Sequence, residues 1–215
     1  IKNITLGHGI TSISVGCFSV TLNLKEITIP NTIKEIGDSS FLYSSINKVT
    51  FEENSTLELI GSSAFSKSSI QIFDLPDSVL YINEGAFLGS MLHGINITDN
   101  SKLVSIGSKA FEKTFISEFN FPNNLHTIGD FAFGETYLTE VTLPASLVNY
   151  APSAFASCHL LENIYIDDNN KYYVDIEGVV YTKDLKTIHE YPAGRKTSSY
   201  TILNNVLYVE EYAFY

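Results

Sequence analysis

The chain has few of the residues and patterns that mark a chemical site. It contains only two cysteines, and its five histidines fall in distant parts of the chain. It has no glycine-rich nucleotide motif, no zinc-type histidine pair, no nucleophile elbow and no Cys-x-x-Cys pair. No apolar run approaches the ~20 residues of a membrane span. We therefore expect no metal, no cofactor and no membrane insertion in this segment.

Basic residues are also scarce. Lys and Arg number 13 against 24 Asp and Glu, which gives a net charge of −11. Nucleic acid and anionic lipid both require a basic footprint, so both are disfavoured as partners. The chain has only 6 prolines and no long Ser/Gly tract, so it offers no obvious flexible linker. A hydrophobic content of 44% is ample for a core, and we expect residues 1–215 to form a single domain.

What the chain does have is a phenylalanine that recurs every 22 to 24 residues, usually behind a small residue. An apolar residue stands five positions before each copy, and an apolar anchor opens each unit. Self-similarity at this period is typical of a solenoid of stacked coils. The chain begins on an anchor and stops just past a repeat phenylalanine, so we expect a fragment of a longer array. The phenylalanines are Phe18, Phe41, Phe65, Phe87, Phe111, Phe133 and Phe155, with Phe214 after a longer gap.

Each unit contains two short extended stretches. In the first, apolar residues such as Ile27 and Ile29 alternate with polar ones, which predicts a strand with one buried face. A proline such as Pro30 then ends it. The second stretch is often followed by a glycine such as Gly37, which indicates a tight bend or a close backbone approach. Stacked in register, the units predict a long parallel sheet and a continuous buried column of phenylalanine rings.

The repeat carries a family resemblance. The units LKEITIPNTIKEIGDSSF and LTEVTLPASLVNYAPSAF resemble those of the BspA-like leucine-rich repeat family of bacterial and protozoan surface proteins. The resemblance covers nearly the whole chain. It implies a β-rich leucine-rich repeat solenoid, with 22–24-residue coils forming a curved parallel β-sheet and little or no α-helix. It also implies a place at the cell surface or outside the cell, and adhesion to host proteins or other cells.

One segment, at about residues 168–200, departs from the regular coil. Its sequence DIEGVVYTKDLKTIHEYPAGRKTSSYTI resembles the irregular unit of the same family. Strand-like stretches at 172–176, 179–181 and 187–191 are separated by polar turns, and the turn at 182–184 predicts a hairpin. We interpret this segment as structural, with a local binding lip as the alternative.

The strand phase also predicts which side chains face outwards. Residues two and four positions after each anchor should form an exposed ladder on the long parallel sheet, and we consider it the candidate surface for a protein partner. Glu26 and Lys48 should be neighbours of opposite charge. Glu118 and Glu140 should be like charges about 5 Å apart. The candidate ladder residues are Thr28, Lys48, Asp74, Asn96, Glu118, Asn120, Glu140, Thr142 and Tyr165.

The cysteines and histidines are interpreted as structural or solvated. Cys17 and Cys158 lie six coils apart, roughly 29 Å at the spacing of stacked strands. A disulfide needs Cα atoms within about 7 Å, so the two cannot pair. Cys17 takes the place of the repeat alanine, which predicts a small core residue. The histidines, His189 among them, are expected to be exposed to solvent and too dispersed to share a metal.

Three functions remain open. The leading hypothesis is a non-enzymatic binding or adhesion module that contacts an extended protein partner through the ladder. The second is a polysaccharide-active solenoid enzyme, because parallel β-helices have coils of similar length. Retaining glycosidases hold two carboxyl groups at about the separation expected for Glu118 and Glu140. That pair lies on an open sheet without loop walls, so we assign no catalytic residue. The third is a passive spacer that projects another domain.

Overall fold

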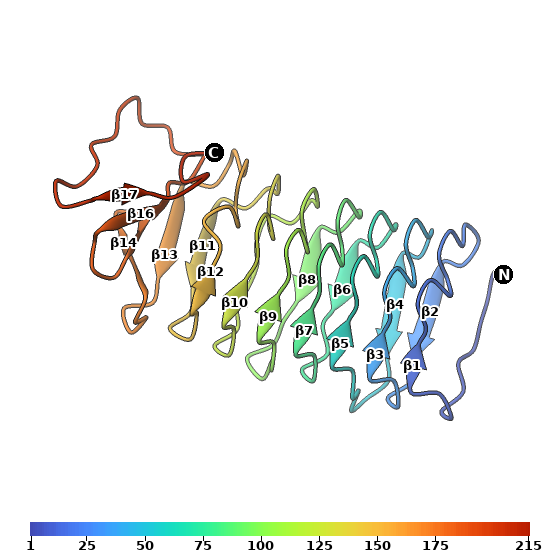
Figure 1. Cartoon of the computed structure of the whole chain (residues 1–215). Helices are drawn as coiled ribbons and strands as arrows, with labels where there is room; N and C mark the ends of the chain where they lie inside the picture. Colours follow the sequence, from blue (N-terminus) through green and yellow to red (C-terminus); the bar gives the residue numbers. More distant parts are fainter.

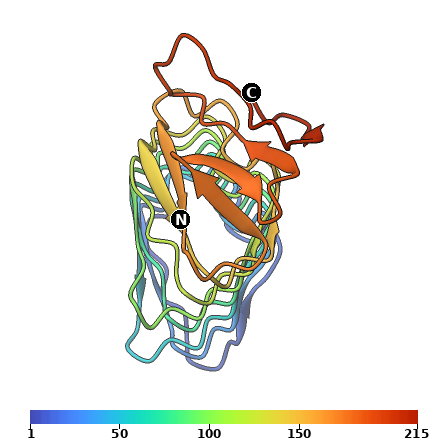
Figure 2. The same ribbon diagram turned by 90° about the vertical axis from the view of Figure 1, so that its left-hand side faces the viewer.

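The computed structural model describes residues 1–215 as one stack of coils built from β-strands, without a helix (Figure 1). Seen along the stack, the coils form a flattened tube with strands along two sides (Figure 2). The ladder side carries β2 (Glu26–Ile29), β4 (Lys48–Phe51), β6 (Ile72–Asp74), β8 (Gly94–Asn96), β11 (Glu140–Leu143) and β13 (Asn163–Ile166). The other side carries β1 (Ser12–Ile13), β3 (Glu35–Ile36), β5 (Leu59–Ile60), β7 (Tyr81–Ile82), β9 (Ser105–Ile106), β10 (Thr127–Ile128) and β12 (Asn149–Tyr150).

The two sides differ in how their strands pair. The side opposite the ladder is a single parallel sheet of seven strands in the order β1-β3-β5-β7-β9-β10-β12. The ladder side consists of three separate parallel pairs, β2-β4, β6-β8 and β11-β13. The stacked parallel solenoid predicted from the repeat is therefore confirmed. The prediction that the ladder lies on the long continuous sheet is wrong, because that sheet is on the other side.

Two phenylalanines lie beside the breaks on the ladder side. Phe73 and Phe119 stand at the position that Ile27 and Val49 hold in other coils. Phe73 is buried, whereas Phe119 is partly buried and packs against the core. The breaks lie between β4 and β6 and on both sides of residues 116–121, so each adjoins a coil with one of these two rings. Phe119 packs on Phe133 with a centroid distance of 4.8 Å. A ring needs more room than an aliphatic side chain, but it does not by itself separate two strands, because Phe73 in β6 lies opposite Ile95 in the paired strand β8.

The predicted phenylalanine column is present in seven coils. From Phe18 to Phe155, successive rings stack with centroid distances of 5.0 to 5.3 Å and interplanar angles of 2° to 19°. Each of these rings is buried, and they belong to one core cluster that runs the length of the stack. Phe214 does not join the column. It is 50% exposed and stacks on Tyr191 instead, with centroids 5.0 Å apart.

The repeat glycine marks a close approach between coils. A Cβ atom on Gly107 would lie 2.7 Å from the backbone nitrogen of Glu84 in the previous coil. That distance is shorter than van der Waals contact permits, so a side chain would push the two coils apart. The close approach predicted from the repeat glycines is confirmed at this position.

The irregular C-terminal unit lies across the end of the stack (Figure 2). Its strands β14 (Tyr173–Ile176), β15 (Val179–Thr182) and β16 (Thr187–Glu190) are antiparallel, and β17 (Tyr208–Val209) pairs with β16 in parallel. Val180 packs into the main core, whereas Val179 and Tyr181 form a second small core with Ile188. The predicted strands and hairpin are confirmed, and the unit covers the apolar end of the seventh phenylalanine coil.

Two predictions about single residues are wrong. Cys17 is exposed rather than a core residue, because residues 1–11 form no strand and do not cover that side of the first phenylalanine coil. His189 is buried with 5% exposure, whereas the other four histidines are exposed as predicted. His189 belongs to β16, and its ring packs against the rings of Tyr150 and Tyr173. Both cysteines are free, so the prediction that they do not pair is confirmed.

Candidate binding face

The candidate ladder is exposed along its whole length. In β2 and β11 the side chains alternate exposed and buried, which places Thr28 and Thr142 outwards and their neighbours in the core. All nine predicted residues are exposed, including Tyr165 at 40%. The expected outward orientation is therefore correct at every position.

The ladder residues are in register from coil to coil within each strand pair. Glu26 lies opposite Lys48 in the β2-β4 pair, as predicted, although no ion pair joins them. Asp74 lies opposite Asn96, whose amide donates a hydrogen bond of 2.6 Å to Asp74 Oδ1. Thr142 lies opposite Tyr165. Polar contacts between adjacent ladder positions thus hold parts of the surface in a defined arrangement.

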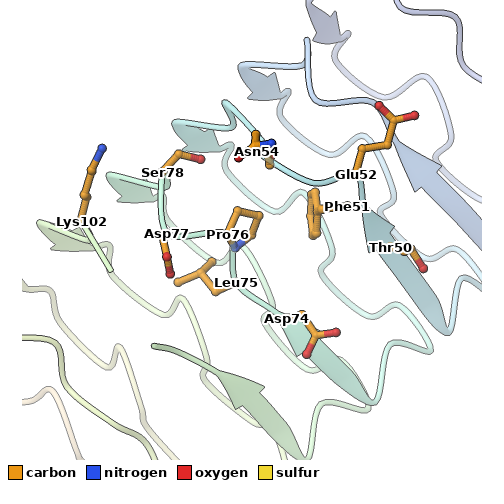
Figure 3. A pocket seen from close by; sticks show the side chains of 11 residues that line it. Thr50, Phe51, Glu52, Asn54, Asp74, Leu75, Pro76, Asp77, Ser78 and Lys102 are labelled. Carbon is orange, nitrogen blue, oxygen red and sulfur yellow. The ribbon is translucent and has the colours of Figure 1, made fainter. Parts of the chain in front are cut away.

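A hollow of about 540 Å³ opens at the first break, between β4 and β6 (Figure 3). The two strands contribute Thr50 and Asp74, and the loops that follow them contribute Glu52 and Asp77. Lys102 from the next coil lies at the rim, and Figure 3 shows its side chain extending away from the backbone of that coil. Three carboxylates against one ammonium group make this hollow acidic.

Two of these carboxylates are fixed by hydrogen bonds. Glu52 accepts the backbone N–H of Asn31 at 3.1 Å and contacts the His8 ring at 3.0 Å. The Asn31 N–H, and then His8, hold the pKa of Glu52 below its ordinary value. Asp77 accepts a hydrogen bond of 2.6 Å from the hydroxyl of Thr98. Both groups are oriented before any partner arrives, which reduces the ordering cost of binding.

Smaller hollows follow along the ladder at the other two breaks. One of about 480 Å³ is lined by Asn96, Glu118 and Asn120. The next, of about 380 Å³, is lined by Glu118, Asn120, Glu140 and Thr142. The ladder face is therefore a row of open polar depressions rather than one deep pocket. Such a surface can contact an extended partner at several points.

The two glutamates that suggested catalysis do share a hollow. Glu118 and Glu140 both line the same depression, yet both side chains are exposed. A general acid of the glycosidase type has a pKa raised by burial. The carboxyl group that has this property is Glu190, whose pKa burial raises to about 8. Glu190 lies beneath the C-terminal unit and away from the ladder, so the three glutamates do not converge.

Two features escaped the prediction. The buried pair of Glu190 and Tyr150 joins the seventh phenylalanine coil to the C-terminal unit, and its only sequence signal is a tyrosine at a position usually held by isoleucine. An exposed row of stacked rings, His93, Phe115 and Tyr137, runs along the edge of the ladder side. Its signal is an aromatic residue directly before the anchor in two consecutive units.

The structure contains no group of three or more His, Cys, Asp or Glu side chains placed to hold a metal ion. No helix long and apolar enough to cross a membrane is found either. The chemistry that the ladder offers is hydrogen bonding and charge pairing from threonine, asparagine, aspartate and glutamate.

Comparison with known proteins identifies relatives over the whole chain. A family model described as the BspA type leucine-rich repeat region, in 6 copies, matches residues 1–105 and 104–215. A leucine-rich cell surface protein from Faecalibacterium prausnitzii superposes with a TM-score of 0.80 at 26% identity, over 95% of this chain and 56% of that protein. The pneumococcal vaccine antigen PcpA superposes with a TM-score of 0.67 at 25% identity, over 95% of this chain and 48% of the antigen.

A leucine-rich repeat protein from Eubacterium ventriosum superposes with a TM-score of 0.51 at 21% identity, over 100% of this chain and 45% of that protein, and this likeness concerns the fold alone. No curated protein sequence matches the chain. The chain spans about half the length of these solved relatives.

Proposed function

Because the chain belongs to the BspA type leucine-rich repeat family, we propose that it is a non-enzymatic protein-binding module. It acts in adhesion, as part of a cell-surface or secreted protein. The observation that carries the proposal is the ladder itself, because its nine candidate residues face outwards along one side of a rigid stack. The buried positions are filled by apolar residues in every coil, whereas the residues of the ladder differ from coil to coil, from Thr28 to Asp74 and Asn96.

The proposed mechanism is multivalent contact along the stack. Seven phenylalanine coils spaced at 5.0 to 5.3 Å give the ladder a length of roughly 30 Å. An interface of standard size buries about 800 Å² on each partner, which a surface of this length can supply. Each threonine or asparagine contributes little alone, so affinity comes from many coils acting together. A rigid scaffold presents them without a large ordering cost.

The location is supported by the relatives. One similar solved structure is described as a cell surface protein and another as a vaccine antigen, and both share the coil architecture over 95% of this chain. An adhesin must lie where an external partner can reach it. These likenesses support the proposal that this chain lies at the cell surface or outside the cell.

The proposal is tested by replacing Asp74, Asn96 and Asn120 together with alanine. The probes are purified extracellular-matrix and cell-surface proteins immobilised for biolayer interferometry. We expect at least one of them to bind the wild-type chain and to lose about ten-fold in affinity for the triple variant. A matched control replaces three exposed residues of the opposite sheet, Glu35, Tyr81 and Asn149.

The control variant should bind like the wild type, and circular dichroism should be the same for all three proteins. Equal loss in both variants, or no loss in the ladder variant, would place the interface elsewhere. No binding to any probe would favour the spacer.

The shared hollow of Glu118 and Glu140 supports a second candidate, an enzyme acting on polysaccharide. That candidate requires turnover of a glycan substrate that Glu118→Gln abolishes.

A further inference from the structure

Three solvent-exposed aromatic rings on consecutive coils stack on one another at the edge of the ladder side. His93 and Phe115 have ring centroids 5.1 Å apart with planes inclined by 15°. Phe115 and Tyr137 follow at 5.8 Å and 18°. All three side chains are exposed, Phe115 at 38% and Tyr137 at 48%. Single exposed apolar residues are normal on protein surfaces, whereas an ordered row of them marks an interaction site.

The repeat itself makes the row unusual. Phe115 and Tyr137 stand directly before the anchor of their units, and the same position in the flanking coils holds Met91 and Leu160. Met91 is 45% exposed and Leu160 50%. The three earlier coils have small polar residues at this position, namely Asn23, Ser45 and Ser69. Coil stacking therefore does not require an apolar residue here, and only four consecutive coils expose one. We refer to Met91, His93, Phe115, Tyr137 and Leu160 as the apolar ridge.

Carboxylates without a cationic partner lie on one flank of the ridge. Glu118 and Glu140 follow Phe115 and Tyr137 by three residues, are exposed, and form no ion pair. Glu140 and Leu160 line one hollow of about 360 Å³, so this flank directly adjoins the ridge; Lys196 also lines that hollow, but it is paired with Glu162 and leaves Glu140 without a cation. The other flank is already neutralised in part, because Lys113 binds Glu112 at 3.7 Å and Glu135 at 3.2 Å. The ridge thus has one acidic edge.

The spacing of the coils selects the shape of the partner. Rings in the core repeat every 5.0 to 5.3 Å along the stack. One turn of an α-helix advances about 5.4 Å, so a helix parallel to the stack presents one apolar side chain to each coil. Residues on the same face of an extended strand repeat about every 6.7 Å and lose register within two coils. A helix keeps register across all four.

We propose that the apolar ridge binds an amphipathic α-helix of a partner protein, lying along the stack with Lys or Arg residues on the flank facing Glu118 and Glu140. This inference rests on the proposed binding function and specifies the chemistry of the partner. Apolar residues at i, i+4, i+7 and i+11 of the helix cover the four coils. Basic residues on one side of that stripe pair with the two free carboxylates, which fixes the direction in which the helix lies.

The test uses a synthetic helical peptide of about 18 residues with a leucine stripe and lysines along one flank. Comparison peptides have glutamate in place of lysine, or the same composition interrupted by proline so that no helix forms. Binding is measured by fluorescence polarisation at two salt concentrations. We expect the basic helix to bind the wild-type chain and both comparison peptides to bind at least about ten-fold more weakly.

Variants of the chain separate the contribution of the exposed rings to peptide binding from that of the carboxylates. Phe115→Ser with Tyr137→Ser should weaken binding about ten-fold or more. Ile72→Ser is the matched control, because Ile72 is 60% exposed and lies outside the ridge. Glu118→Gln with Glu140→Gln should weaken binding and reduce its salt dependence, whereas Glu35→Gln with Glu58→Gln changes the net charge equally and should leave binding unchanged.

Equal binding by the proline-interrupted peptide, or unchanged binding after the loss of Phe115 and Tyr137, would overturn the inference. The same holds if the two glutamine pairs have equal effects, because binding would then follow net charge alone. These failures would leave the ladder proposal standing. Conversely, the alanine variant of Asp74, Asn96 and Asn120 keeps the ridge intact, so its result does not depend on the helix.

Discussion

The hydroxyl of Tyr150 donates a hydrogen bond to the carboxyl group of Glu190, 40 residues later, and both side chains are buried. The other carboxyl oxygen of Glu190 accepts the backbone N–H of Phe155 at 3.2 Å. Next to Glu190, the His189 ring contacts the backbone carbonyl of Tyr150 at 2.8 Å. The C-terminal unit is thus attached to the seventh phenylalanine coil through two buried ionisable groups.

These two groups predict how stability depends on pH. Burial raises the pKa of Glu190 to about 8, so folding keeps it protonated where the unfolded chain is ionised. Its contribution to stability therefore falls as the pH rises from about 4.5 to about 8. Burial lowers the pKa of His189 to about 4, so its contribution falls as the pH drops from about 6.5 to about 4. Between about 4.5 and 6.5 the two slopes cancel.

Between pH 6.5 and pH 8 the free energy of unfolding of the wild type should fall by about 2 kcal/mol, at about 1.4 kcal/mol per proton and pH unit. We expect this fall to be absent in Glu190→Gln. Glutamine keeps the acceptor for Phe155 and offers an N–H to Tyr150. The measurement is the free energy of unfolding in urea at half-unit pH steps. Glu58→Gln, at an exposed position, is the control and should follow the wild type. A wild-type profile that stays parallel to that of Glu190→Gln would contradict the proposed buried, protonated state.

The phenylalanine column predicts unequal losses on truncation. Phe111 is fully buried between Phe87 at 5.3 Å and Phe133 at 5.2 Å, so Phe111→Ala should reduce the free energy of unfolding by about 3–5 kcal/mol. Phe18 has one stacked neighbour, Phe41, and 9% exposure, so Phe18→Ala should cost less. Equilibrium urea unfolding compares the two. Equal costs would mean that the coils do not stabilise one another.

Gly107, at which two coils approach closely, allows a second comparison between a variant and its control. In Gly107→Ala the new methyl carbon would lie 2.7 Å from the backbone of the previous coil, so neighbouring strands must separate and stability should fall by about 1–3 kcal/mol. Gly94→Ala is the control, because a Cβ there meets nothing within 4 Å. Thermal melting of the two variants should differ clearly, with Gly107→Ala the lower. A similar melting temperature for both would show that the coils tolerate the added atom.

Much of the fold could be predicted from the repeat, because its period and the alternation within it are local properties. The alternation around Ile27 places Thr28 outwards whatever the pairing of the strand. The pairing of strands could not be predicted in this way, because it depends on how closely two coils approach. That distance cannot be deduced from the polar–apolar pattern, in which Phe73 and Phe119 count as apolar in the same way as Ile27. The pattern therefore predicted the exposed ladder but not the breaks that hollow it.

Other errors came from residues whose environment is made by a distant segment. His189 has the local pattern of an exposed polar residue, and only the packing of β16 over the seventh coil buries it. Glu190 is hidden for the same reason. The apolar ridge was missed because its members look like ordinary variation until Phe115 and Tyr137 are placed beside each other on consecutive coils. Three-dimensional neighbourhood, not residue type, defines these features.

The two cysteines should react with thiol reagents at very different rates. Cys17 is exposed, whereas Cys158 is buried and donates a hydrogen bond of 3.0 Å to the backbone carbonyl of Phe133. Burial raises the pKa of Cys158 to about 11, so almost none of it is thiolate at pH 8. Iodoacetamide followed by mass spectrometry should show one alkylated cysteine per native chain and two in urea. Cys17→Ser should abolish the native reaction. Modification of Cys158 in that variant at the wild-type Cys17 rate would contradict its burial in the core of the stack.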